Sequence, residues 1–270
     1  MKPFCRILAT LFLASLMCGF GAAPHQSSSG SCALEDAFQS RWILPHWQAW
    51  VCGFAVAPQQ SSSGSCALEC VLKKMDAVAA DFHTAQADFV WDQYQKVVDE
   101  HDTQKGTVYY RRAGNEIEMM AEIKEPMAKF MLYKDGKLQV YQPSMEQVMS
   151  FSAGSNRNEM ESYLVLGFGG SGEDLKKTYD VAYVGEDRID NIATAKLQLI
   201  PKSDKVRNYF SKAFLWIDSS RGISVQQQFM EAQGDQRLAK YSAIQVGAKI
   251  DKDVFQLKTT KKTQFVSPRG

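Results

Sequence analysis

Apolar and polar residues alternate with a period of two over much of this chain, a pattern typical of β-strands with one buried face. The clearest case is 116–123, where Ile117, Met119, Ala121 and Ile123 alternate with mostly acidic residues. Other strands are predicted, from alternation or from short apolar runs between turn residues, at 85–98, 107–112, 179–185, 193–200, 213–218, 223–231 and 238–246. The chain is therefore rich in antiparallel sheet.

A three-stranded meander is predicted between Met127 and Met149. Asp135-Gly136 lies between two short strand-like runs, and this dipeptide favours a tight hairpin because both residues tolerate a positive φ. A second reversal is predicted at Gln142-Pro143-Ser144. The segment therefore reads as three antiparallel strands of a sheet.

Helical spacing appears in two places. Apolar residues recur every three or four positions from Leu68 to Phe82, which predicts an amphipathic helix before the first strand. Residues 158–168 and 173–178 also read as helices, separated by a glycine-rich stretch at 167–172. One helix, a long sheet, a helical insertion and more sheet together predict an α+β fold.

The first residues read as a secretory signal peptide at 1–23. Lys2 and Arg6 precede an apolar run from Ile7 to Met17, which is too short to span a membrane as a stable anchor. The processing site stays open. Gly21-Ala22-Ala23 is followed by Pro24, and Leu16-Met17-Cys18 resembles a lipoprotein box without its small residue.

Residues 24–66 are predicted to be a disordered leader, and residues 67–270 a single folded domain. The segment Cys18–Glu35 recurs at Cys52–Glu69 with three mismatches, and both copies contain a Ser-rich run typical of flexible linkers. One such pair cannot build a repeat architecture. We interpret it as a duplicated junction between signal peptide and domain.

Composition excludes several functions. A net charge of +1 gives no basic surface for nucleic acid. All six cysteines lie in the first seventy residues and lack the spacing of a zinc site. The domain contains only two histidines, His83 and His101. No metal, no cofactor and no catalytic group is therefore predicted, and the protein is not expected to be an enzyme.

One dinucleotide-type motif does occur. Gly167, Gly169 and Gly172 satisfy G-x-G-x-x-G, but a helix precedes them where the motif needs a strand. We interpret the run as a connector between two helices.

Several motifs resemble the LolA family of periplasmic carriers of outer-membrane lipoproteins. They are the stretch Gly106–Arg112, the run KDGKLQVYQPSMEQV, the LWID of Leu215–Asp218, and the following VQQQF. The resemblance covers roughly Leu68–Pro268, with a terminal strand near Phe265. It implies an incomplete, unclosed antiparallel β-barrel with an N-terminal helix and a helical lid insertion.

The resemblance also implies the function and the site. The apolar interior would shelter the acyl chains of lipoproteins, received from an inner-membrane lipoprotein-releasing transporter and passed to an outer-membrane acceptor. The family's lid-gating arginine corresponds to Arg112 in YYRRAG, with Arg111 as the alternative on the other face of the strand. The residues expected to line the acyl-chain cavity are Phe89, Trp91, Val108, Tyr110, Ile117, Met119, Phe130, Leu132, Val140, Leu164, Leu197, Phe214 and Trp216.

Three alternatives stay open at this point. The same apolar residues could fill a packed core, since sequence does not distinguish a void from a packed interior. A LolB-like acceptor anchored to the membrane through Cys18 would share the fold. So would a sensor or regulator domain that binds a protein partner.

Overall fold

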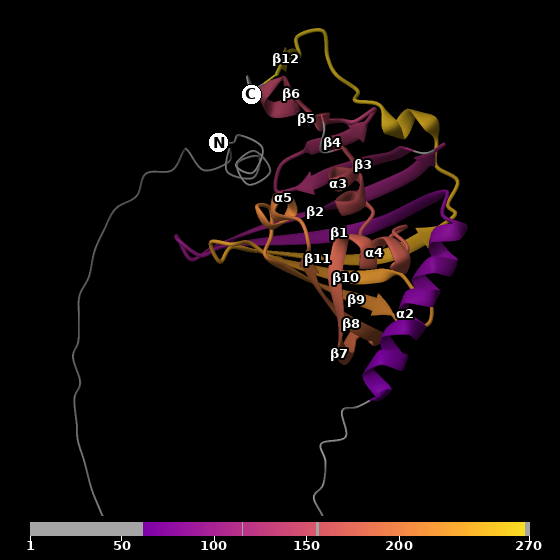
Figure 1. The fold of residues 1–270 in the computed structure, drawn as a ribbon. Coiled ribbons are helices and arrows are strands. Elements are labelled where there is room, and N and C mark those ends of the chain that lie inside the picture. The colour runs from indigo at the N-terminus through magenta and orange to yellow at the C-terminus, as the bar shows by residue number, and fades with distance from the viewer. Residues whose placement is uncertain (1–61, 115, 155–156, 268–270) are drawn as a thin grey trace, which may run out of the picture. The chain divides into compact units, whose positions relative to one another are not determined.

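The computed structural model describes residues 62–114, 116–154 and 157–267 (Figure 1). Its framework is a twelve-stranded sheet with the order β12-β6-β5-β4-β3-β2-β1-β11-β10-β9-β8-β7. The strands are β1 (Thr84–Gln95), β2 (Glu100–Ala113), β3 (Glu116–Glu125), β4 (Lys129–Lys134), β5 (Lys137–Gln142), β6 (Gln147–Ser152), β7 (Tyr179–Ile189), β8 (Ile192–Pro201), β9 (Lys212–Asp218), β10 (Ser224–Met230), β11 (Gln236–Val246) and β12 (Gln264–Val266). The helices are α2 (Ser62–Ala80), α3 (Arg157–Leu164), α4 (Gly172–Thr178) and α5 (Asp204–Arg207), with 3-10 turns η2 (Pro143–Met145) and η4 (Lys252–Phe255).

The sheet does not close into a barrel. Neighbouring strands pair antiparallel, except that the short β12 runs parallel to β6. The end strands of the described sheet, β7 and β12, lie at opposite ends of its order. The predicted α+β fold with an unclosed barrel is confirmed, and the parallel pair at one end is the only departure from an all-antiparallel sheet among the described strands.

The meander forms as its turn residues predict. Asp135 and Gly136 both adopt positive φ, 52° and 68°, and Lys134 pairs with Lys137 across the hairpin. The second reversal is the turn η2, which begins at Pro143, where the missing N–H costs nothing.

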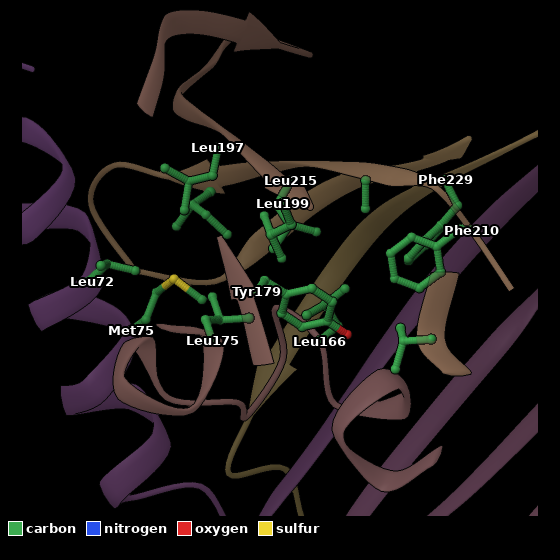
Figure 2. Close-up of a cluster of buried hydrophobic side chains, with 13 residues drawn as sticks. Leu72, Met75, Leu166, Leu175, Tyr179, Leu197, Leu199, Phe210, Leu215 and Phe229 are labelled. Atoms are coloured by element: carbon green, nitrogen blue, oxygen red, sulfur yellow. The ribbon is translucent and has the colours of Figure 1, made fainter. Parts of the chain in front are cut away.

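Helix α2 begins at Ser62, six residues before the predicted start, and ends at Ala80. It lies against α4 and β7 (Figure 1). Figure 2 shows Leu72 and Met75 pointing from α2 toward Leu175 of α4 and the strands β8 and β9. The buried side chains of this cluster are Leu72, Met75, Leu166, Leu175, Tyr179, Leu197, Leu199, Val206, Phe210, Ala213, Leu215, Ile217 and Phe229.

Each strand presents alternate residues to two faces of the sheet, and residues paired across neighbouring strands share a face. One row of pairs runs Trp91, Ala239, Gln227, Leu215 and Leu197. We call this the inner face, because Leu197 and Leu215 meet α2 and α4 there.

The opposite, outer face is also covered over part of the sheet. Phe255 of η4 packs with Met120 and Leu132 and is completely buried. Strand β3 is therefore buried on both faces, with Met119 inside and Met120 outside.

Parts of the predicted organisation lie outside the described residues. These are the signal peptide at 1–23 and the leader up to residue 61. The described helix α2 takes in the last five residues assigned to the leader. Within the described ranges, no helix is long and apolar enough to cross a membrane, and no group of three or more His, Cys, Asp or Glu side chains could hold a metal ion.

Candidate functional site

Residues 157–178, which comprise α3, the connecting loop and α4, cover part of the inner face and are called the lid. Leu166 and Leu175 of the lid belong to the same buried cluster as Leu197 and Leu215. Phe168 extends this cover to other strands. Its ring stacks on Tyr110 of β2 at 5.3 Å between centroids and meets Tyr241 of β11 edge-on at 4.6 Å. The lid thus touches the apolar inner face over strands that are far apart in sequence.

Arg112, at the end of β2, connects the sheet, the residues after α2 and the lid. Its Nε donates to the Phe82 carbonyl oxygen at 3.3 Å, and its Nη2 donates to the Gly169 carbonyl oxygen at 3.4 Å. The guanidinium also lies 5.7 Å from the centre of the Phe82 ring. Both hydrogen bonds are longer than the usual 2.9–3.0 Å and are correspondingly weak.

The glycines of the lid loop are required by close packing. A Cβ at Gly169 would lie 2.7 Å from the Phe82 ring, and one at Gly172 would lie 2.7 Å from Leu72 Cβ. Gly167 adopts a φ of +81° and lies against Ser224. The G-x-G-x-x-G run therefore seats the lid against α2 and β10, and the interpretation as a connector holds.

A second contact fixes α3 over the meander. Arg157 donates to Glu161 at 2.8 Å and pairs with Glu116 of β3 at 2.7 Å. The buried Tyr133 hydroxyl donates to Glu161 at 3.2 Å. Burial and the Glu161 carboxylate raise the pKa of Tyr133 well above its usual range, so it remains a donor. No pattern in the sequence pointed to this network.

The predicted cavity residues divide between the two faces. Those on the inner face are Phe89, Trp91, Val108, Tyr110, Ile117, Met119, Val140 and Leu197. All of these are buried except Trp91, which is half-buried and stacks on Phe89 at 4.0 Å. Leu164 is half-buried at the end of α3, in the lid.

The other four residues lie on the outer face. Phe130 and Leu132 point away from Met131 and Tyr133, which hold the inner positions of β4. Phe214 and Trp216 alternate with Ala213 and Leu215 in the same way. Successive side chains of a strand point to opposite faces, so these two lie on the outer face. The structure therefore does not bring Phe130, Leu132, Phe214 and Trp216 together with the rest of the set.

The two arginines of YYRRAG are separated by the same alternation. Arg111 points to the outer face, where it donates to Glu118 Oε2 and stacks over Phe255 at 4.3 Å. Arg112 reaches the lid. Only Arg112 is therefore in a position to act on the lid.

Comparisons with solved structures give weak similarities. A LolA superfamily protein from Nitrosomonas europaea matches with 16% identity and a TM-score of 0.37, over 70% of this chain and 97% of that one. LprF from Mycobacterium bovis matches with 12% identity and a TM-score of 0.42, over 70% and 97%. MucB matches with 15% identity and a TM-score of 0.46, over 72% of this chain but only 64% of MucB.

A LolA superfamily protein is thus among the similar structures, as the sequence resemblance predicts. With TM-scores below 0.5, these similarities say nothing about function. No curated protein matches the chain. A protein-family model matches residues 118–265, from β3 through the lid to β12, which is more than half of the 270 residues. The chain therefore belongs to the family that this model defines, whose description is "-like: Uncharacterized protein".

Proposed function

We propose that the protein is a periplasmic carrier that binds the acyl chains of lipoproteins on its inner face, beneath the lid, and moves them from the inner to the outer membrane. The observation that carries this proposal is the pair of long hydrogen bonds from Arg112 to the Phe82 and Gly169 carbonyls. They hold the lid over the inner face, and an acyl chain that enters beneath the lid must break them. The resemblance to the LolA family supports the same role.

The energetics suit a carrier. Each buried methylene of an acyl chain contributes about 0.8 kcal/mol, so a lipid anchor is strongly driven out of water. In the closed protein, lid side chains such as Phe168 and Leu166 occupy the inner face instead. An acyl chain would replace these contacts with similar ones. The open, loaded state and the closed, empty state can then be close in free energy, as transfer requires.

The inner face also offers adaptable walls. Met119 and Met131 are both buried there, and methionine side chains adjust to chains of different shape. An inner-membrane transporter would load the carrier, and an outer-membrane acceptor would unload it.

Two tryptophans on opposite faces allow a direct test. Trp91 lies on the inner face and Trp216 on the outer face. Acyl chains brominated near their middle quench indole fluorescence on contact. We expect a brominated lipopeptide to quench the tryptophan fluorescence of the wild-type protein. The Trp91→Phe variant should lose the share of the quenching that comes from Trp91.

Trp216→Phe is the matched control and should keep the full quenching. The remaining three tryptophans precede residue 62 and are common to all three proteins, so differences report only on Trp91 and Trp216. Absence of quenching in the wild type, with no binding heat in calorimetry, would refute acyl-chain binding. Quenching lost only in Trp216→Phe would place the acyl chains on the outer face.

A further inference from the structure

Polar side chains gather at one end of the inner face, next to Trp91. Gln93 pairs across the sheet with Asp102 of β2 and with Arg237 of β11, and Gln104 pairs with Trp91. We call Gln93, Asp102, Gln104 and Arg237 the polar row. Pairing places all four side chains on the inner face, since residues opposite one another share a face.

Three buried side-chain atoms of the polar row have no hydrogen-bond partner among the described residues. They are the acceptors Gln93 Oε1 and Gln104 Oε1, whose residues are only 4% and 3% exposed, and the donor Arg237 Nε, which an amide carbonyl oxygen could accept from. At Gln104 the amide nitrogen and oxygen are distinguished by their partners. Nε2 donates to Asp102 Oδ2 at 2.8 Å, and a carboxylate only accepts, so the atom without a partner is the oxygen. A buried acceptor without a donor is unfavourable, so this end of the inner face favours a molecule that brings an N–H or O–H group.

The charges around the polar row restrict what that molecule is. The Asp102 carboxylate beside Gln104 interacts with the ammonium of Lys129, a buried residue on the inner face of β4. Arg237 forms an ion pair with Glu231 at 3.5 Å without a hydrogen bond from its Nε, and its guanidinium lies over the rings of Phe229 and Tyr163. The two cations and two carboxylates balance one another, so a neutral ligand is favoured over an anion, which would bring an uncompensated charge into this buried end of the face.

We infer that the polar row binds the amide N–H at the head of an N-acylated ligand, whose acyl chain continues along Trp91 and Phe89. This rests on the proposed function and names the chemical class that the site selects: an N-acyl amide, as in an N-acylated protein terminus, and not a free fatty acid. The ring of Tyr163, in the lid, contacts Arg237, so a ligand bound at the polar row also lies next to the lid.

A pair of ligands that differ in one atom group tests this inference. N-lauroylglycine methyl ester carries the amide N–H, and its depsi counterpart, methyl 2-(lauroyloxy)acetate, has an ester oxygen in the same place. We expect the full-length protein to bind the amide about tenfold more tightly than the depsi compound in calorimetry. Gln104→Met keeps the side-chain length but lacks the acceptor, and it should bring the two affinities within about twofold.

Gln198→Met, on the outer face of β8, is the matched control and should keep the tenfold preference. Equal binding of both ligands by the wild type would overturn the amide site while leaving acyl-chain binding intact. Binding of neither would overturn both proposals. If Gln104→Met fails to fold, the wild-type comparison decides alone. A preference that survives in a folded Gln104→Met overturns the assignment to Gln104.

Discussion

Arg112→Leu is expected to bind a lipopeptide about tenfold more tightly than the wild type and to release it about tenfold more slowly to acceptor vesicles. In the wild type, an acyl chain beneath the lid must break the contacts of Arg112 with the Phe82 and Gly169 carbonyls. The part-buried guanidinium then loses both acceptors, which raises the free energy of the loaded state. Leucine removes this cost. Equilibrium binding and stopped-flow transfer of a fluorescent lipopeptide measure the two effects separately.

Arg111→Leu is the neighbouring control, and its expected phenotype is different. It leaves the buried Glu118 with Lys134 at 3.2 Å as its remaining cation, and it removes the stacking on Phe255. We expect the free energy of unfolding to fall by about 1–3 kcal/mol, with lipopeptide transfer unchanged. Wild-type transfer rates in Arg112→Leu would defeat the gating role. A transfer defect in Arg111→Leu alone would assign that role to the other arginine.

Strand positions were predictable because alternation is a direct consequence of the pleated backbone. The hairpin at Asp135-Gly136 followed from its turn residues. The face of each apolar residue was harder to predict. In β4, Met131 and Leu132 lie on opposite faces and both are buried. The strand therefore has no alternation of apolar and polar residues that would distinguish its inner face from its outer face.

The alternation is missing because η4 covers the outer face of β3 and β4. Phe255 reaches the sheet from the short 3-10 turn η4, which is too short for a strand alternation or a helical repeat to show which of its side chains is buried. Gln93 and Gln104 were missed for the converse reason. A glutamine in a strand usually faces water, and only the register shows that these two face inward. Arg112 was identified through family resemblance, and alternation could separate it from Arg111 but not say which of the two faced inward.

Phe255→Ala is expected to lower the free energy of unfolding by about 3–5 kcal/mol, the usual range for deleting a completely buried phenylalanine. The change opens a cavity against Met120 and Leu132 and exposes both to water. It also removes the ring on which Arg111 stacks. Chemical denaturation followed by circular dichroism measures the loss.

The matched control for this prediction is Phe265→Ala in β12, ten residues further along the same C-terminal segment. Phe265 is 66% exposed, so its removal should change the free energy of unfolding by no more than about 0.5 kcal/mol. Because Phe255 lies on the outer face, quenching of Trp91 by a brominated lipopeptide should persist in Phe255→Ala under conditions where the variant remains folded. Equal stability losses in the two variants would show that the C-terminal segment does not form a specific layer on the outer face. Loss of Trp91 quenching in a folded Phe255→Ala would mean that the two faces of the sheet are coupled, and that the outer layer contributes to binding.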